Sequence, residues 1–223
     1  MKKILLFSLL LALTFTSCKK EVEKNDITET SKAFVELLTN YNEESYKLFP
    51  LNATFAGDNR YNDKLPNDLT DEFSTKLKSF YTTTKNNLAK FNDEDLSDSE
   101  KMSKAVLTWD CDINLERLNF REDLTPINQM WTMNLMFGQL ASGAGAQPFE
   151  TVQDYNNWLK RVDSYLEWLN SAEERMKEGI ELGHVLPKSL IVKVLPQLES
   201  GAIEDLDKHL FFTPVKNMPD DFS

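Results

Sequence analysis

Apolar residues recur at the spacing of an α-helix along most of this chain of 223 residues. Side chains three and four positions apart meet on one side of a helix. An early set of this kind stands before Pro50 and comprises Ala33, Phe34, Leu37, Leu38 and Tyr41. No stretch alternates apolar and polar residues for long enough to indicate a strand. These patterns predict an all-α fold.

Three helices are expected in the first half of the chain. The first ends before Pro50, and residues 50–69, rich in Asn and Asp, are expected to form a long ordered loop. The second carries a stripe of Phe73, Leu77, Phe80, Leu88 and Phe91. The third begins with a capping box of Ser97 and Glu100. Its two apolar stripes predict a central helix packed between neighbours: Met102, Val106, Trp109 and Ile113 on one side, Leu107, Cys111, Leu115 and Leu118 on the other.

Three more helices are expected in the second half. Thr125 and Pro126 provide an N-cap and a first-turn proline for a helix that ends at residues 143–145. The longest helix opens at residues 151–154 and ends near Gly183. Its expected inner side comprises Val152, Tyr155, Leu159, Val162, Leu166, Leu169 and Met176. Another helix starts at Pro187 and is kinked or ended by Pro196. The chain is thus expected to form an array of about six helices, as one domain or part of one.

The N-terminus has the three parts of an export signal. Lys2 and Lys3 precede an apolar run over residues 4–15, which is too short to cross a bilayer as a helix. Small residues then lead to Cys18, as in the lipobox that lipoprotein signal peptidase cleaves, although Phe15 stands where leucine is usual. A plain secretory signal with an incidental cysteine is the alternative, and the charged stretch that begins just after Cys18 disfavours it.

The expected organisation is therefore a lipoprotein signal peptide (residues 1–17), a lipidated tether (18–26) and a helical domain (27–223). Acyl chains on Cys18 contribute roughly 0.8 kcal/mol per buried methylene and anchor the chain to a membrane. Lys19, at the second mature position, disfavours retention at the inner membrane. We expect a lipid-anchored protein of the bacterial cell envelope, held at the outer membrane on its periplasmic or surface side.

Composition excludes some classes of partner and of site. Without residues 1–17, 23 basic residues remain against 36 acidic ones, so nucleic acid is not an expected partner. Once Cys18 carries lipid, Cys111 has no disulfide partner, and its helical apolar setting favours a buried structural thiol over a nucleophile. His184 and His209 belong to no His-Glu-x-x-His motif. We assign no catalytic, cofactor-binding or metal residue, and the one modified position is Cys18.

Two segments admit both a functional and a structural interpretation. The methionine- and tryptophan-rich residues 130–136 fit an apolar ligand groove, but core packing is favoured because Met and Trp fill helix interfaces. Residues 142–146 (SGAGA) superficially resemble a phosphate loop. No lysine follows them and a helix, not a strand, precedes them, so a helix end and turn is favoured.

Two clusters of polar residues likewise admit both a metal-binding and a structural interpretation. Asp58, Asn59 and Asp63 suggest calcium, but their spacing does not fit a twelve-residue calcium loop, and a solvated loop is favoured. Glu178, Glu181 and His184 recur every three residues, so one helical face offers three metal ligands. A surface patch is favoured for them.

Several segments, taken in order, resemble a known bacterial family. They are residues 46–58 (YKLFPLNATFAGD), 61–66 (YNDKLP), 148–149, 154–155, 158–161 (WLKR), 178–179, Gly183, Pro187 and 211–214 (FFTP). Together they resemble the opening of domain of unknown function 885, a family often found in lipoproteins, over roughly residues 30–214. Each motif is soft alone, and the ordered set is fairly specific.

The resemblance implies the N-terminal part of a larger helical, gluzincin-like zinc-peptidase fold. In such a fold a His-Glu helix of the C-terminal half holds Zn²⁺ and lowers the pKa of a bound water. No such helix is present in this chain, so zinc and a peptide substrate are expected only with a missing C-terminal half. The chain also stops soon after a mid-domain motif, which suggests a truncated gene product or an incomplete sequence.

Two further hypotheses remain open at this point. One is a non-enzymatic helical binding lipoprotein that captures glycans or peptides, since four tryptophans and six tyrosines provide stacking surfaces. The predicted burial of most aromatic residues disfavours it. The other is a stand-alone periplasmic scaffold without a ligand, which the absence of motifs permits.

Lipidation of Cys18 can be tested by comparing the two cysteines. Cys18→Ala should abolish incorporation of labelled palmitate and leave residues 1–17 attached, because the acyl acceptor is gone. Cys111→Ala should still be labelled and cut. Both are measured by labelling in cells and by the mass of the purified chain. Labelling of the Cys18→Ala variant would contradict the assignment.

Overall fold

The computed structural model describes residues 28–130 and 132–219. The assigned signal peptide, Cys18, the tether over residues 18–26 and Trp131 lie outside these ranges. Within them the chain forms eight α-helices and five short 3-10 helices and has no strand, so the all-α prediction is confirmed. None of the described helices is both long enough and apolar enough to cross a bilayer.

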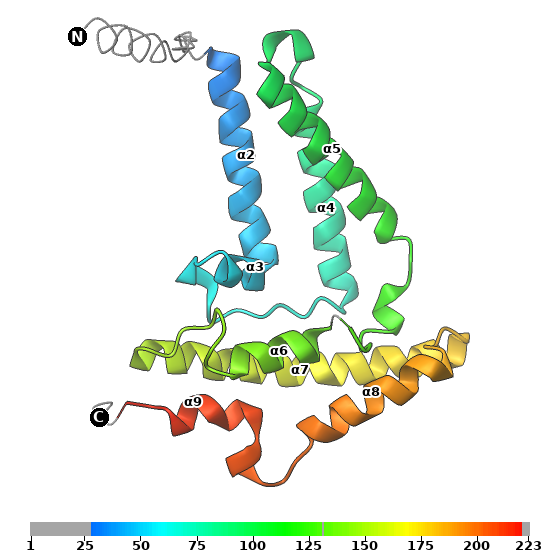
Figure 1. Cartoon of the computed structure of the whole chain (residues 1–223). Coiled ribbons are helices and arrows are strands. Elements are labelled where there is room, and N and C mark those ends of the chain that lie inside the picture. Colours follow the sequence, from blue (N-terminus) through cyan, green and yellow to red (C-terminus); the bar gives the residue numbers. More distant parts are fainter. Residues whose placement is uncertain (1–27, 131, 220–223) are drawn as a thin grey trace, which may run out of the picture.

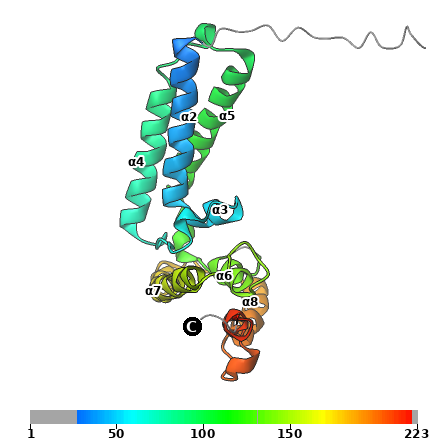
Figure 2. The ribbon, with the colours of Figure 1, turned by 90° about the vertical axis from the view of Figure 1, so that its left-hand side faces the viewer.

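Three long helices form the first body of the structure: α2 (Glu29–Leu48), α4 (Asp71–Leu88) and α5 (Asp98–Arg117). They stand upright above the rest of the fold, with α4 and α5 packed side by side and α2 next to them (Figure 1 and Figure 2). Their shared core consists of Phe34, Tyr81, Leu88, Leu96, Leu107 and Cys111. The predicted capping box of Ser97 and Glu100 is present. The three helices predicted here are thus confirmed.

The second body is built along α7 (Val152–Leu182), which crosses beneath the upright helices (Figure 1). α6 (Met133–Ala141), α8 (Lys188–Gly201) and the short α9 (Thr213–Lys216) accompany it. Phe137 stacks on Trp158 and Tyr165, with ring centroids 4.6 and 4.3 Å apart. Phe211 meets all three rings edge-on. This aromatic cluster is the centre of the second core.

Residues 50–69 join the two bodies and are more regular than the predicted loop. They contain α3 (Pro50–Phe55) and a 3-10 turn, η1 (Asn59–Tyr61). Pro50 does end α2, but it also begins α3, since proline fits the first turn of a helix, where its missing N–H is not needed. Leu51, Leu65 and Leu69 from this stretch join the core around α7.

Arg161 of α7 fixes this connecting segment and is fully buried, with 0% of its surface exposed. Its guanidinium donates to the carbonyls of Lys64 (3.1 Å) and Tyr61 (3.0 Å), to the Thr54 hydroxyl (2.7 Å) and to the Gln147 amide oxygen. Burial lowers its pKa to about 10, so it remains charged at neutral pH. A buried charge needs such a set of acceptors.

The predicted start of a helix at Thr125 is wrong, whereas the predicted end before residues 143–145 is confirmed. Residues 125–130 are irregular, and α6 begins only at Met133, after its N-cap Thr132. Thr125 instead terminates a 3-10 turn, η3 (Glu122–Leu124), whose Leu124 is buried. The Thr-Pro pair was a local signal, and the burial of Leu124 outweighed it.

The predicted inner faces of α5 and α7 need correction. In α5 the stripe of Leu107 and Cys111 is buried, but Met102, Val106 and Trp109 face solvent, so this helix is not central. In α7 the fully buried residues are Trp158, Arg161, Tyr165, Trp168, Ala172 and Gly179. Val162, Leu169 and Met176 of the predicted stripe only flank the core. Val152, Leu159 and Leu166 are exposed. Because the buried stripe contains Arg161, the search for apolar residues at helical spacing did not identify it.

Two glycines shape the end of α7. Gly183 ends the helix with a left-handed φ of 72°, as predicted, because glycine adopts this conformation without a steric cost. Gly179 lies inside the helix and is required by close approach: a Cβ there would lie 2.7 Å from the His184 carbonyl oxygen and 3.0 Å from that of Leu124. Pro196 neither ends nor splits α8, which continues to Gly201.

Replacement of Arg161 tests its structural role. Arg161→Met fills a similar volume but removes four hydrogen bonds, those to Thr54, Tyr61, Lys64 and Gln147, so the free energy of unfolding should fall by about 3 kcal/mol or more. Lys160→Met, at the exposed neighbouring position, should change it by less than about 0.5 kcal/mol. Urea unfolding followed by circular dichroism measures both. A loss below about 1 kcal/mol for Arg161→Met would contradict this role.

Candidate functional site

The polar residues considered for calcium form ion pairs instead of a shared site. Asp58 pairs with Arg60 at 2.6 Å, and the hydrogen bonds from Arg60 lower the pKa of its carboxyl. Asp63 pairs with Lys64 at 3.1 Å and lies 3.6 Å from Lys160. This arrangement fits the solvated-loop interpretation.

The proposed metal face at the end of α7 is also not assembled. Glu178 accepts hydrogen bonds from Arg121 (2.7 Å) and Arg175 (2.9 Å). Glu181 and His184 are exposed. Across residues 28–130 and 132–219, no three His, Cys, Asp or Glu side chains are placed to share a metal ion.

The two remaining segments divide between core and surface. Residues 142–146 follow the end of α6, with Ser142 as its C-cap and Gly143 at a φ of 71°. Met133 and Met136 pack against the core around α7, as the packing interpretation predicts, whereas Met130 is exposed.

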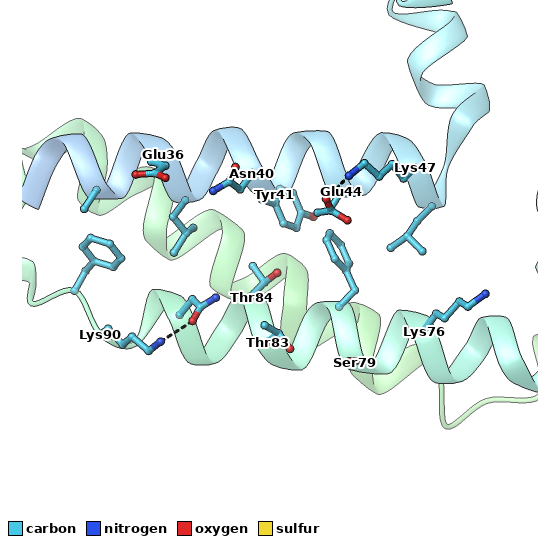
Figure 3. Close-up of a pocket in the computed structure, with 16 residues that line it drawn as sticks. Glu36, Asn40, Tyr41, Glu44, Lys47, Lys76, Ser79, Thr83, Thr84 and Lys90 are labelled. Carbon is cyan, nitrogen blue, oxygen red and sulfur yellow. Dashed lines mark hydrogen bonds and ion pairs between the residues drawn. The ribbon is translucent and has the colours of Figure 1, made fainter. Parts of the chain in front are cut away.

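A shallow groove runs between α2 and α4, with a volume of about 620 Å³ (Figure 3). Tyr41 and Phe80 stack at its base, with ring centroids 5.1 Å apart. At the rim, Lys47 is bonded to Glu44 of the same helix, and Lys90, just past the end of α4, is bonded to Asn87. The groove has an apolar base and a polar rim, and we assign no catalytic or ligand-binding residue to it.

A larger cavity of about 730 Å³ lies where the upright helices meet α6 and α7. Its walls come from α4, α5, α6, α7, the turn η3 and the turn at residues 68–70. The apolar part of its lining includes Phe49, Phe73, Leu77, Met133, Met136 and Trp168. The charged part comprises Asp68, Asp71, Arg117, Arg121, Glu122, Asp123 and Arg175.

One face of α7 contributes the floor of this cavity, through Trp168 and Arg175. Trp168, Ser171 and Arg175 are three and four residues apart and therefore share one helical face. They bind three successive residues of the connecting segment. The Trp168 indole N–H donates to the Asp68 carboxylate (2.7 Å), Asn67 donates to the Ser171 hydroxyl (2.7 Å), and Arg175 Nε donates to the Leu69 carbonyl (2.9 Å). Asp68 is thereby held in one place on the cavity wall.

Comparison with known proteins identifies the family. A family model described as "Bacterial protein of unknown function (DUF885)" matches residues 50–222. The chain belongs to this family. The resemblance inferred from the ordered motifs is thus confirmed. No curated protein and no solved structure matches the chain.

The family motifs quoted above converge around α7. Thr54, Tyr61 and Lys64, from the first two motifs, all accept hydrogen bonds from Arg161 of the motif at residues 158–161. Tyr155 donates to the Pro214 carbonyl (3.1 Å), which joins the helix start to the last motif. These residues build the fold, and none of them lines the larger cavity.

Asp68, Trp168 and Arg175 were not singled out from the sequence. One signal was available for the buried face of α7: Trp158, Arg161, Tyr165, Trp168 and Ala172 recur at alternating spacings of three and four. Asp68 had no such signal, because an acidic residue between Asn67 and Leu69 is typical of a solvated loop.

Cys111 is fully buried, as predicted, and its reactivity can be tested. Burial, with the nearby Asp110 carboxylate, raises the pKa of its thiol to about 11. The thiolate is the reactive form, so at pH 8 its population should be roughly 100-fold below that of an ordinary thiol. In a Cys18→Ser variant, Cys111 should react with a disulfide reagent at least 100-fold faster in urea than in the native state. Equal rates would contradict this assignment.

Proposed function

We propose that this chain is the lipid-anchored, N-terminal helical part of a zinc-peptidase-like protein of the bacterial envelope. Its role is to hold the protein at the membrane and to form part of the wall around a peptide-binding cleft. The catalytic residues and the zinc ion belong to another part of that protein. Membership of the family and the lipobox-like sequence before Cys18 support the proposal.

The observation that carries it is the apolar surface that the described residues leave exposed on three helices. Met102, Val106 and Trp109 on α5, Leu159 and Leu166 on α7, and Val192 and Leu195 on α8 are each at least half exposed. Apolar faces of this kind mark contact surfaces in soluble proteins. A further helical body packed on them is what the zinc-peptidase-like interpretation requires.

The described residues do not fit a zinc ion. His209 Nδ1 accepts from the Phe211 amide (3.2 Å), and its Nε2 lies 3.1 Å from the Gly201 carbonyl oxygen, so both ring nitrogens are engaged. His184 has no acidic or cysteine partners arranged with it as a three-ligand group in the described ranges. We therefore assign no catalytic step to residues of this chain.

The cavity at Asp68 favours a second candidate, a non-enzymatic binding lipoprotein that captures peptides. Capture of glycans is less well supported, because Trp158 and Trp168 are buried and offer no stacking face to a sugar. A peptide array probed with the full chain tests this candidate, and a glycan array probed in parallel tests the other ligand class.

A peptidase assay tests the leading proposal. The full chain, supplied with Zn²⁺ and a mixed peptide library, should release no fragments above the background of the zinc solution, since the proposal places the metal ligands in another part of the protein. Cleavage that a chelator abolishes would contradict the assignment of catalysis to another part. The nucleotide sequence after the codon for Ser223 gives a second test: a continuing frame with a His-Glu helix motif is expected.

A further inference from the structure

The cavity between the upright helices and α7 contains one unbalanced charge. Three arginines line it, and each is paired with a carboxylate. Arg117 bonds to Glu122 at 2.8 Å, Arg121 to Asp123 at 3.0 Å, and Arg175 to Asp71. These three pairs account for every charged lining residue except Asp68.

Asp68 has no cationic partner among the residues that the structure describes. Its Oδ1 accepts a hydrogen bond from the Trp168 indole (2.7 Å), which is a neutral donor. The residue is exposed and open to the cavity. Partial desolvation by the surrounding protein raises the pKa of Asp68 above the ordinary value of an aspartate. An incoming cation would therefore meet an accessible carboxylate that no described cation neutralises.

The rest of the lining suits an apolar body attached to such a cation. Phe73 is buried, and its ring meets that of Phe49 edge-on at a centroid distance of 6.2 Å. Met133 and Met136 reach the cavity from α6, and methionine adapts its shape to apolar ligands. A largely apolar pocket with one well-placed polar group is the usual form of a small-ligand site.

We propose that this cavity binds a primary ammonium group carried on an apolar or aromatic body, with the Asp68 carboxylate as its counter-ion. The ammonium occupies the side of the carboxylate that the indole leaves free. The apolar body lies against the side chains contributed by α4 and α6. This site requires neither zinc nor a second protein part, so it stands independently of the function proposed above.

Calorimetric titration of the full chain in detergent micelles tests the site with three probes of similar size. They are 2-phenylethylammonium, the neutral 2-phenylethanol and the anionic 3-phenylpropanoate, each corrected for its heat of mixing with micelles alone. The ammonium probe should bind at least tenfold more tightly than the other two. Equal binding of all three, or no binding of the ammonium probe, would overturn the proposal.

Asp68→Asn provides the matched variant, because an asparagine oxygen can still accept the Trp168 indole hydrogen bond. It should weaken binding of the ammonium probe at least tenfold and leave the neutral probe unchanged. Asp98→Asn, at a fully exposed aspartate at the start of α5, should leave both unchanged. Unaltered ammonium binding in a folded Asp68→Asn variant would overturn the assignment. If that variant does not fold, the charge selectivity of the natural chain decides.

Discussion

A single buried cation, Arg161, determines how the two helical bodies are joined. A guanidinium removed from water must keep its hydrogen bonds, and it finds them on neutral acceptors instead of a carboxylate. Three of those acceptors, on Thr54, Tyr61 and Lys64, belong to the segment between α2 and α4. The segment therefore has to lie along α7, and the upright helices that it connects are placed with it.

The same face of α7 continues this function about two to four turns further on. Trp168, Ser171 and Arg175 bind Asp68, Asn67 and Leu69, so the connecting segment contacts the helix again along this stretch. The position of Asp68 is consequently set by helical spacing rather than by its own loop. A cavity wall held in this way is rigid before any ligand arrives, which lowers the entropic cost of binding.

The sequence predicted what is local in this fold and missed what depends on tertiary contact. The long helices, the Ser97–Glu100 capping box and the end of α7 at Gly183 follow from neighbouring residues, and the structure contains them. Which of two stripes on α7 faces the core depends on the segments packed against the helix. Counting apolar residues favoured the stripe with Leu159 and Leu166, whereas the buried stripe contains Arg161. The role of Asp68 could not be predicted, because it depends on how the cations around the cavity are paired. Those cations come from distant parts of the chain, and none of the described ones pairs with Asp68.

The absence of a side chain at Gly179 determines how closely the turn η3 approaches α7 beside the cavity. Gly179 allows the Leu124 carbonyl to rest directly on α7, and Leu124 ends the turn η3, which carries Glu122 and Asp123 into the cavity wall. Any larger residue at position 179 would push this turn away from the helix and lengthen the 3.4 Å contact between Asp123 and Arg175 of α7. The ion pairing between η3 and α7 at the cavity wall thus depends on a glycine 11 positions along α7 from Trp168.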